Sequence, residues 1–521
     1  MKNIKYTLLF FASLLLSCEV TDTELTENPN ALTPSNADVD FFINAAQEDF
    51  ARMVDRFGEI AAEMVRIEQM NTSIYDQAYS PSSFNDEWET TYQGIFQDLK
   101  VMNALAEDSG QRFHIGMGQV FQGYLMLTLV DFFGDVPYSE ALLGDSENQN
   151  LNPGADSGQA VYTAAIGLLR EAVTNFAAGA PAPAVDLYYG GDADKWTKAA
   201  NSILKKAYLT MGDTASYNSI TNYITSSSDD FQFHWGSNEV QPDTRHPTYA
   251  QGYTSTGGGL YQSNWLMGTM NELGDPRLAY YFYRQVSAVP GFDGAAPNEE
   301  TIECSTFLNS APIHYQQNNQ RFCGLSGGYW GRDHGNQDGI PPDGFLRTLP
   351  GVYPAGGTFD DGSFDGQVNG DGAGGAGITP VMLASWLAFM DAEVSPSRGA
   401  LLDAVRLSLE KSDDLGGAPA LADDAIQSYL NTVGFAYDND AANTFAEQYF
   451  IALYGNGIDG YNYYRRTGYP TTLQLNIEPN PGPFPTIMWY PADHVQNNSN
   501  AAQRGNLSEK VFWNTQSPSL N

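Results

Sequence analysis

The stretch RFHIGMGQVFQGYLMLTLVDFFGDVPYSEAL, residues 112–142, decides the fold. Apolar residues recur along its first part at alternating steps of four and three, which is the spacing of one face of an α-helix. They are Phe113, Met117, Val120, Tyr124 and Leu127. Gly134 and Pro137 then interrupt the pattern, as residues that end helices do. A helix over 111–131, closed by a sharp turn, is therefore predicted.

The same period returns in 194–211 and in 380–395, where Thr379-Pro380 predicts an N-cap and a first helical residue. Further helices are predicted near 37–55, 58–70, 84–108, 158–178, 398–411, 420–432 and 440–455. Neighbours such as 84–108 and 111–131 would pack as antiparallel hairpins, and several in succession would form a solenoid. No clean self-similarity recurs at 34 residues, so a repeat does not follow from the sequence alone.

Between about 228 and 377 the composition changes. Gly, Pro, Asn and Asp multiply and the apolar runs shorten. Loops of this length within a domain are usually functional. The chain is thus predicted to be mainly α, with one domain over 37–521. Its helical scaffold would occupy about 37–227 and 378–521, with a long loop-rich insertion over about 228–377 between the two parts.

The N-terminus has the layout of a secretory signal peptide. Lys2 and Lys5 precede an apolar run that is too short to span a bilayer comfortably, and Ser17-Cys18 follows. Leu-Leu-Ser-Cys at 15–18 resembles a bacterial lipobox, which implies removal of 1–17 and acylation of Cys18. The alternative is an ordinary signal peptide with an incidental cysteine. Residues 18–36 would then form a lipidated, acidic tether that holds the protein on a membrane.

The charge of the chain limits its partners. The formal net charge is -37, and it becomes -39 once Lys2 and Lys5 are removed with the leader. Such a chain repels nucleic acid and anionic bilayer surfaces, so no nucleic-acid partner is expected.

Two cysteines remain beside Cys18, namely Cys304 and Cys323. An exported compartment favours a disulfide between them, and two free thiols are the alternative. They fit no zinc pattern because no Cys-x-x-Cys accompanies them. Asp361 and Asp365 imitate the first half of a calcium loop, but Gly372 stands where a bidentate Glu is needed. No cofactor is therefore expected, with calcium at this turn as the weaker alternative.

The sequence singles out no catalytic residues. None of the six histidines belongs to an HExxH motif, and 62 carboxylates give no distinguished acid pair. We therefore expect a protein without catalytic activity.

Short motifs carry a resemblance to a known family. They are NPNALTP at 28–34, FGDVPYSEAL at 133–142, KWTKAANSILKKAYL at 195–209, GDPRL at 274–278, GRDHG at 331–335, YYRRTGYP at 463–470 and MWYP at 488–491. Together with the lipobox they resemble the SusD/RagB family of Bacteroidetes outer-membrane lipoproteins, over nearly the whole mature chain. The resemblance implies TPR-like helix pairs that cradle a loop-rich ligand-binding region. It also implies cell-surface exposure and a SusC-like TonB-dependent transporter as partner.

A glycan-binding site needs flat aromatic faces beside amides, carboxylates or Arg, presented on loops. The candidate rings are Tyr75, Tyr79, Trp235, Trp265, Tyr329 and Trp330, and the polar candidates are Asn264, Arg332 and Asp333. For each ring alone, packing inside the protein is the simpler interpretation. Trp88 and Trp196 are assigned to helix packing, and His334 to a structural hydrogen bond.

The predicted function is capture of oligosaccharides at the cell surface and their delivery to the transporter. A peptide-binding lipoprotein of the same kind of uptake complex is the alternative. A surface glycoside hydrolase is a third hypothesis.

Overall fold

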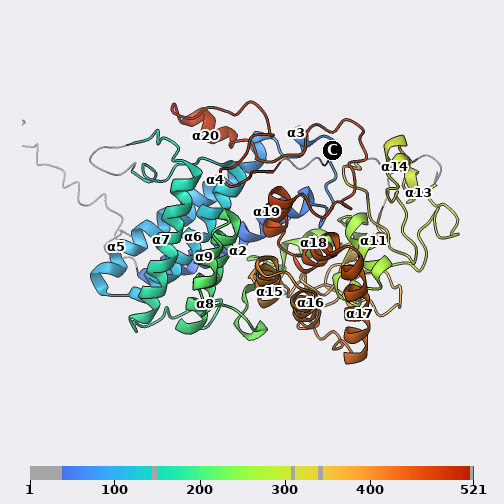
Figure 1. Cartoon of the computed structure of the whole chain (residues 1–521), viewed down its shortest axis with the longest axis horizontal. Coiled ribbons are helices and arrows are strands. Elements are labelled where there is room, and N and C mark those ends of the chain that lie inside the picture. Colours follow the sequence, from blue (N-terminus) through green and yellow to red (C-terminus); the bar gives the residue numbers. More distant parts are fainter. Residues whose placement is uncertain (1–37, 144–149, 307–310, 338–343, 517–519, 521) are drawn as a thin grey trace, which may run out of the picture.

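The computed structural model describes residues 38–143, 150–306, 311–337, 344–516 and 520. Helices dominate it (Figure 1): those of the first half of the chain stand together on one side, and the C-terminal helices lie beside them. The loop-rich middle segment lies at the far end from the first helices. The predicted mainly-α class is confirmed. No described helix combines the length and the apolar character that a bilayer crossing needs.

The first half begins with the long helix α2. Its elements are α2 (Val39–Met64), α3 (Tyr75–Ala78), the 3-10 turn η3 (Pro81–Phe84), α4 (Asn85–Glu89), the π-helix η4 (Thr90–Phe96), α5 (Gln97–Ser109), α6 (Arg112–Phe133), α7 (Gly158–Ala177), α8 (Ala193–Met211), α9 (Thr214–Ser219) and the 3-10 turn η5 (Ser227–Asp229). Consecutive members of the series α5 to α8 contact one another, so the predicted hairpin of 84–108 with 111–131 is present.

The helix α6 lies inside this group and is buried around most of its circumference. It contacts α2, α5, α7 and α8. Two of its glycines allow the close approach of α7, because a Cβ at Gly116 would stand 2.8 Å from the Phe176 ring and one at Gly123 would stand 2.9 Å from Leu169. An apolar helix that is buried on all sides is what the core of a large domain requires.

Two predicted helix boundaries are wrong. The segments 37–55 and 58–70 form one helix, because Gly58 marks a close contact and not a break: a Cβ there would lie 3.2 Å from the Asn456 Cα. The segment Thr379-Pro380 lies in a strand and does not open a helix. Helix α15 begins at Ala384, whose N–H donates to the Asp230 carboxylate at 2.7 Å. A side chain from a distant part of the sequence thus accepts a hydrogen bond from a backbone N–H at the start of this helix.

The described residues of the middle segment form short elements. They are β1 (Phe231–His234), α10 (Pro247–Gly252), β2 (Tyr253–Thr254), β3 (Gly257–Gly258), α11 (Asn264–Leu273), α12 (Leu278–Tyr281), β4 (Phe282–Tyr283), α13 (Glu303–Thr306), α14 (Ile313–Gln317), β5 (Leu349–Pro350) and β6 (Ile378–Met382). The described strands form three antiparallel pairs, β1 with β6, β2 with β3, and β4 with β5.

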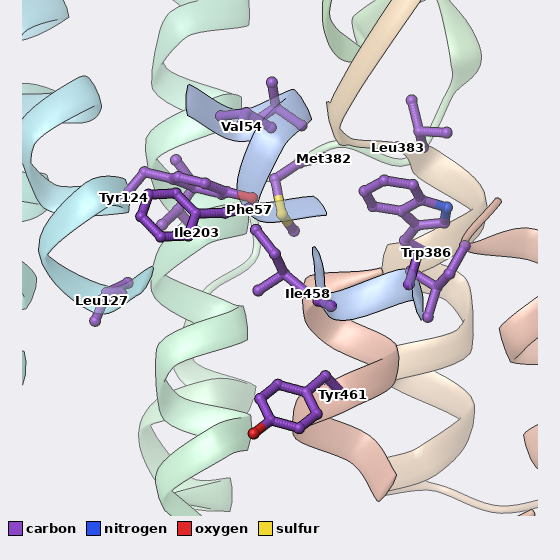
Figure 2. Close-up of a cluster of buried hydrophobic side chains, with 14 of the residues drawn as sticks. Val54, Phe57, Tyr124, Leu127, Ile203, Met382, Leu383, Trp386, Ile458 and Tyr461 are labelled. Carbon is purple, nitrogen blue, oxygen red and sulfur yellow. The ribbon is translucent and has the colours of Figure 1, made fainter. Parts of the chain in front are cut away.

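The C-terminal half returns to helices. They are α15 (Ala384–Val394), α16 (Arg398–Ser412), α17 (Asp423–Asn439), α18 (Ala441–Ala452), α19 (Ile458–Thr467) and α20 (Ala492–Asn497). Figure 2 shows where the two halves meet: Phe57 of α2 and Ile203 of α8 belong to the same buried cluster as Trp386 of α15 and Ile458 of α19. One apolar core therefore joins segments that are far apart in the sequence.

The motif that ends α6 is tied to the C-terminal half through a buried carboxylate. Asp131 accepts hydrogen bonds from the Tyr162 hydroxyl, from Asn462 Nδ2 at 2.6 Å and from the Trp513 indole N–H at 3.0 Å. Arg465 donates to the Asp131 carbonyl at 2.7 Å. Burial raises the pKa of Asp131, and the charge of Arg465 opposes that shift. We call Asp131, Tyr162, Asn462, Arg465 and Trp513 the Asp131 network.

The GDPRL motif forms a second buried polar cluster. Asp275 and Arg277 are both fully buried and pair at 2.6 Å. Arg277 also donates to Ser408 at 2.8 Å and to Gln448 at 2.9 Å, and the Tyr429 hydroxyl donates to Asp275 at 2.7 Å. A buried ion pair keeps its place only when its remaining donors and acceptors are satisfied, and these partners come from α16, α17 and α18.

A row of carboxylates follows α2 and continues just beyond its end, formed by Asp55, Glu59, Glu63 and Glu68. Burial raises the pKa of Asp55 to about 7, and the charge of Glu59 adds to the shift. Burial also raises the pKa of Glu63 and Glu68. The Asp55 side chain is 13% exposed and accepts a hydrogen bond from Thr379 at 3.3 Å.

We expect Asp55→Asn to change how stability depends on pH. The folded-state pKa of Asp55 lies above its ordinary value of 3.8, so the folded protein holds the proton more tightly. The ionised carboxylate therefore destabilises the fold increasingly as pH rises towards 7. Denaturant unfolding should show that the stability advantage of Asp55→Asn over the parent is about 2–3 kcal/mol larger at pH 8 than at pH 5. The exposed Asp108→Asn on α5 is the control, and equal advantages at both pH values would contradict the assignment.

Candidate functional site

The ring residues predicted to bind a glycan are buried. Tyr75, Tyr79, Trp235, Trp265, Tyr329 and Trp330 are each at most 6% exposed. Trp330 packs in a small core with Val289, Ile302 and Cys323. Tyr75 accepts a hydrogen bond from Arg66 at 2.9 Å and its hydroxyl lies 3.3 Å from His334.

The remaining rings also contact neighbouring groups of the protein. Arg52 lies over Trp235, Arg284 lies over Tyr329, and Tyr79 packs against Phe84. The Trp265 indole N–H donates to the Thr472 carbonyl at 2.9 Å. A ligand could reach most of these faces only by displacing such packing, so their role in binding stays a prediction that this arrangement does not favour.

The three polar candidates are buried as well. Asp333 accepts from Asn264 Nδ2 at 2.8 Å, from Gln474 Nε2 at 2.9 Å and from the Cys323 N–H at 3.0 Å, and burial raises its pKa. Arg332 lies over the Tyr261 ring at 4.0 Å. These residues hold the loops of the middle segment together, which is a structural role.

The structure describes only some of the residues in the cysteine and calcium predictions. Cys323 is disulfide-bonded, whereas the side chain of Cys304 and the whole of Cys18 lie outside the described residues. The disulfide pairing and the lipidation stay predictions.

The two calcium candidates make hydrogen bonds within the protein. The Asp361 carboxylate accepts the Ser363 N–H at 2.9 Å, and the Asp365 carbonyl accepts the Tyr283 hydroxyl at 3.0 Å. Among the described residues, no three His, Cys, Asp or Glu side chains gather to hold a metal ion.

A surface hollow lies instead between α4 and α20. Its larger part has a volume of about 540 Å³ and its smaller part about 290 Å³, and both are lined by Trp88, Gln93, Leu151, Pro153 and His494. We call the two parts the aromatic hollow. Figure 1 shows α20 above α4 at the edge of the first group of helices.

The floor of the aromatic hollow is a cluster of rings. The half-buried Trp88 ring lies 4.8 Å from Tyr92 and 4.5 Å from His494, and it meets Phe133 edge-on at 5.5 Å. The Tyr92 hydroxyl donates to the Pro137 carbonyl at 2.7 Å. Tyr92 and Gln93 belong to the π-helix η4, a rare element that is frequent at functional sites. The rings are therefore held in fixed orientations before any ligand arrives.

The wall formed by residues 150–153 is fastened to the segment after α20. Asn498 Nδ2 donates to the Pro153 carbonyl at 2.8 Å, and the Ser499 N–H donates to Asn152 Oδ1 at 2.7 Å. Asn500 Nδ2 donates to the Asn152 carbonyl at 2.6 Å. These bonds place Leu151, which is 69% exposed, at the rim of the aromatic hollow.

The polar lining of the aromatic hollow consists of amides and two carboxylates. The amides are Asn85, Gln93, Gln97, Asn150, Asn497 and Asn498, and the carboxylates are Glu89 and Asp493. Among the lining residues that the structure describes there is no Lys or Arg. Burial lowers the pKa of His494 to about 4, so this ring is neutral at neutral pH. The arrangement suits a neutral ligand with flat apolar faces and many hydroxyl groups.

The sequence prediction that Trp88 packs against helices is right but incomplete, since the same ring also lines the aromatic hollow. Trp88 and Tyr92 are four residues apart and therefore share a helix face. That spacing was the available signal, but it could not show that His494 from the far end of the chain would lie against it.

The helical frame thus carries a hollow of rings and amides on its surface. A family model named SusD-like_2, described as "Starch-binding associating with outer membrane", matches residues 29–318, more than half of the chain. The chain therefore belongs to the SusD-like family, as its motifs predicted. It is a nutrient-binding protein associated with the outer membrane.

Solved structures agree with this fold. A SusD/RagB family protein from Bacteroides thetaiotaomicron VPI-5482 is 19% identical with a TM-score of 0.65, and the match covers 92% of this chain and 100% of that one. A chitin-binding protein is 18% identical with a TM-score of 0.62, covering 92% and 100%. A SusD homolog from Bacteroides fragilis NCTC 9343 is 18% identical with a TM-score of 0.61, covering 91% and 99%. No curated protein sequence matches the chain.

Proposed function

We propose that this protein captures neutral oligosaccharides at the cell surface in the aromatic hollow and delivers them to a SusC-like TonB-dependent transporter. The observation that carries the proposal is the ring cluster of Trp88, Tyr92 and His494, bordered by amide side chains. An indole face packs against the apolar face of a sugar ring, while amides donate to and accept from its hydroxyls. One structural relative is named as a chitin-binding protein, which supports this ligand class.

Charge favours a neutral glycan over an acidic one. The lining carries Glu89 and Asp493 without a Lys or Arg, and the whole chain has a formal charge of -37. A polyanionic glycan would meet repulsion at the hollow and over the protein as a whole. A peptide would need apolar pockets or charges for its side chains, and the open ring floor suits sugar rings better.

The aromatic hollow favours binding over hydrolysis. Cleavage of a glycosidic bond needs one carboxylic acid kept protonated by its surroundings, set across the bond from an ionised carboxylate. Glu89 and Asp493 are both exposed to solvent. Neither is enclosed by apolar groups that would retain a proton, so we propose a binding protein that releases its ligand unchanged.

Calorimetry with neutral oligosaccharides, acidic oligosaccharides and peptides tests this function. We expect saturable binding of at least one neutral oligosaccharide and none of comparable strength for the other two classes. Reducing ends should not accumulate over the time of the titration. Tight binding of peptides alone would favour the peptide hypothesis, and sustained release of reducing ends would favour the hydrolase.

Membrane attachment and the transporter partnership form a separate prediction. Cys18→Ser should move the protein from the membrane fraction to the soluble fraction, because acyl chains each contribute about 0.8 kcal/mol per buried methylene. The matched control is Ser13→Ala, which leaves the Leu-Leu-Ser-Cys segment intact. The wild-type protein solubilised from native membranes should co-purify with a large barrel protein. Retention of Cys18→Ser on the membrane would contradict the anchor.

A further inference from the structure

A second surface trough lies away from the aromatic hollow, and the two share no lining residue. It consists of two hollows of about 350 and 470 Å³ that have Asn318, Gln320 and Thr471 in common. We call it the amide trough. Figure 1 shows α11 and α14, whose residues lead into it, on the right of the molecule, whereas α4 and α20 lie in its upper part, left of the centre.

The floor of the amide trough is fixed by buried side chains. Trp265 of α11 is tied by its indole N–H to the Thr472 carbonyl at 2.9 Å. Gln474 is 2% exposed and donates to Asp333 at 2.9 Å and to the Arg321 carbonyl at 3.2 Å. Its own side-chain oxygen accepts the His334 N–H at 3.1 Å. A ligand therefore meets a rigid floor.

The rim of the amide trough presents polar groups of both kinds. Gln320 Oε1 accepts the Leu475 N–H at 3.2 Å, which leaves the amide nitrogen of Gln320 as a donor. Asn318 and Asn319 are exposed beside it, and the Thr471 hydroxyl lies at the same rim. Such groups both donate and accept hydrogen bonds, which matches the hydroxyls of a sugar, since each hydroxyl also does both.

The charges of the amide trough cancel. Arg321 pairs with Glu272 through two bonds, of 3.0 and 2.6 Å, and also donates to Thr269 at 3.3 Å. A bidentate pair leaves no net charge to attract an ionic ligand. Little apolar surface faces a ligand, because Trp265 and most apolar residues of the second hollow are buried, namely Tyr464, Pro470, Leu473 and Leu520.

We propose that the amide trough is a second saccharide-binding site, specific for neutral, hydroxyl-rich chains. The inference rests on the proposed function because it assumes the same class of ligand. A chain long enough to reach both hollows gains affinity from the second contact, which becomes intramolecular. Shorter chains reach only one hollow each, so the two sites bind separate chains independently.

The test uses calorimetry with neutral gluco-, xylo-, manno- and chito-tetrasaccharides and the corresponding longer chains. For the series that binds, and at saccharide concentrations that fill the wild-type sites but not the weakened ones, we expect two tetrasaccharides per wild-type molecule, one per Trp88→Ala molecule and one per Gln320→Ala molecule. At these concentrations the combined variant should show no measurable binding. The site changed by Gln320→Ala should lose about tenfold in affinity or more, since a lost hydrogen bond contributes about 1.5 kcal/mol.

A matched control and a structural readout separate the possible results. Gln317→Ala alters an exposed amide of α14 outside the amide trough and should bind as the wild type does. Slower hydrogen exchange on saccharide binding is expected in 318–321 and 468–475 of both wild type and Trp88→Ala. Binding of one tetrasaccharide that Trp88→Ala abolishes and Gln320→Ala leaves unchanged would overturn the second site alone. Absence of any saccharide binding would overturn the proposed function as well.

Discussion

Trp88→Ala is expected to weaken binding of the preferred oligosaccharide to the aromatic hollow by about 30- to 100-fold. Buried or half-buried Trp residues at binding sites typically contribute about 2–3 kcal/mol, and each 1.4 kcal/mol is a factor of ten. Trp88 lines both parts of the hollow and aligns His494, so no neighbour can replace its face. Calorimetry on the purified variant measures the loss.

The control for this prediction is Phe435→Ala. Phe435 is 72% exposed on α17 and does not line the hollow, so its removal should leave affinity unchanged. Because Trp88 also packs against Phe133, thermal unfolding of both variants must confirm that each is folded at the temperature of the titration. A folded Trp88→Ala protein with wild-type affinity would show that the ligand binds elsewhere.

Asp131→Ala is expected to lower the free energy of unfolding by about 3–5 kcal/mol. The change leaves the Tyr162 hydroxyl, the Trp513 indole N–H and the Asn462 amide without their common acceptor inside the protein. It also leaves the buried Arg465 without a nearby negative charge. Unpaired buried donors and charges are costly because water cannot replace the lost partner.

Denaturant unfolding of Asp131→Ala and Asp131→Asn measures this effect. The Asn variant keeps one acceptor oxygen and should lose less stability than the Ala variant. Asp403→Ala is the control, because Asp403 is exposed on α16 and its removal should change stability by less than about 0.5 kcal/mol. A loss below about 1 kcal/mol for Asp131→Ala would mean that the Asp131 network does not join the two halves of the chain.

Hydrophobic periodicity predicted the fold well where a helix has a continuous apolar face. The segment of α6 is the clearest case, and α7, α8 and α16 also lie close to their predicted limits. The pattern did not predict α19, because Ile458–Thr467 is rich in Tyr, Asn and Arg. Those polar groups are buried with partners from other segments, such as Asp131 for Asn462. Hydrogen bonds to partners that lie far away in the sequence leave no periodic pattern in the sequence.

The candidate site was harder to predict, for a related reason. The rings of the loop-rich segment were candidates for ligand contact, yet Trp330 packs in a small core of this segment and Tyr329 packs in the main core. The loops achieve this through hydrogen-bonded centres such as Asp333. The aromatic hollow instead joins Trp88 to His494, and only the folded chain brings these two residues together.

The most direct test of the account is a crystal structure of the protein with the neutral oligosaccharide that it binds most tightly. We expect a sugar ring in contact with the Trp88 face, with hydroxyls hydrogen-bonded to the amides of the aromatic hollow. A bound saccharide found only outside the aromatic hollow would contradict the account.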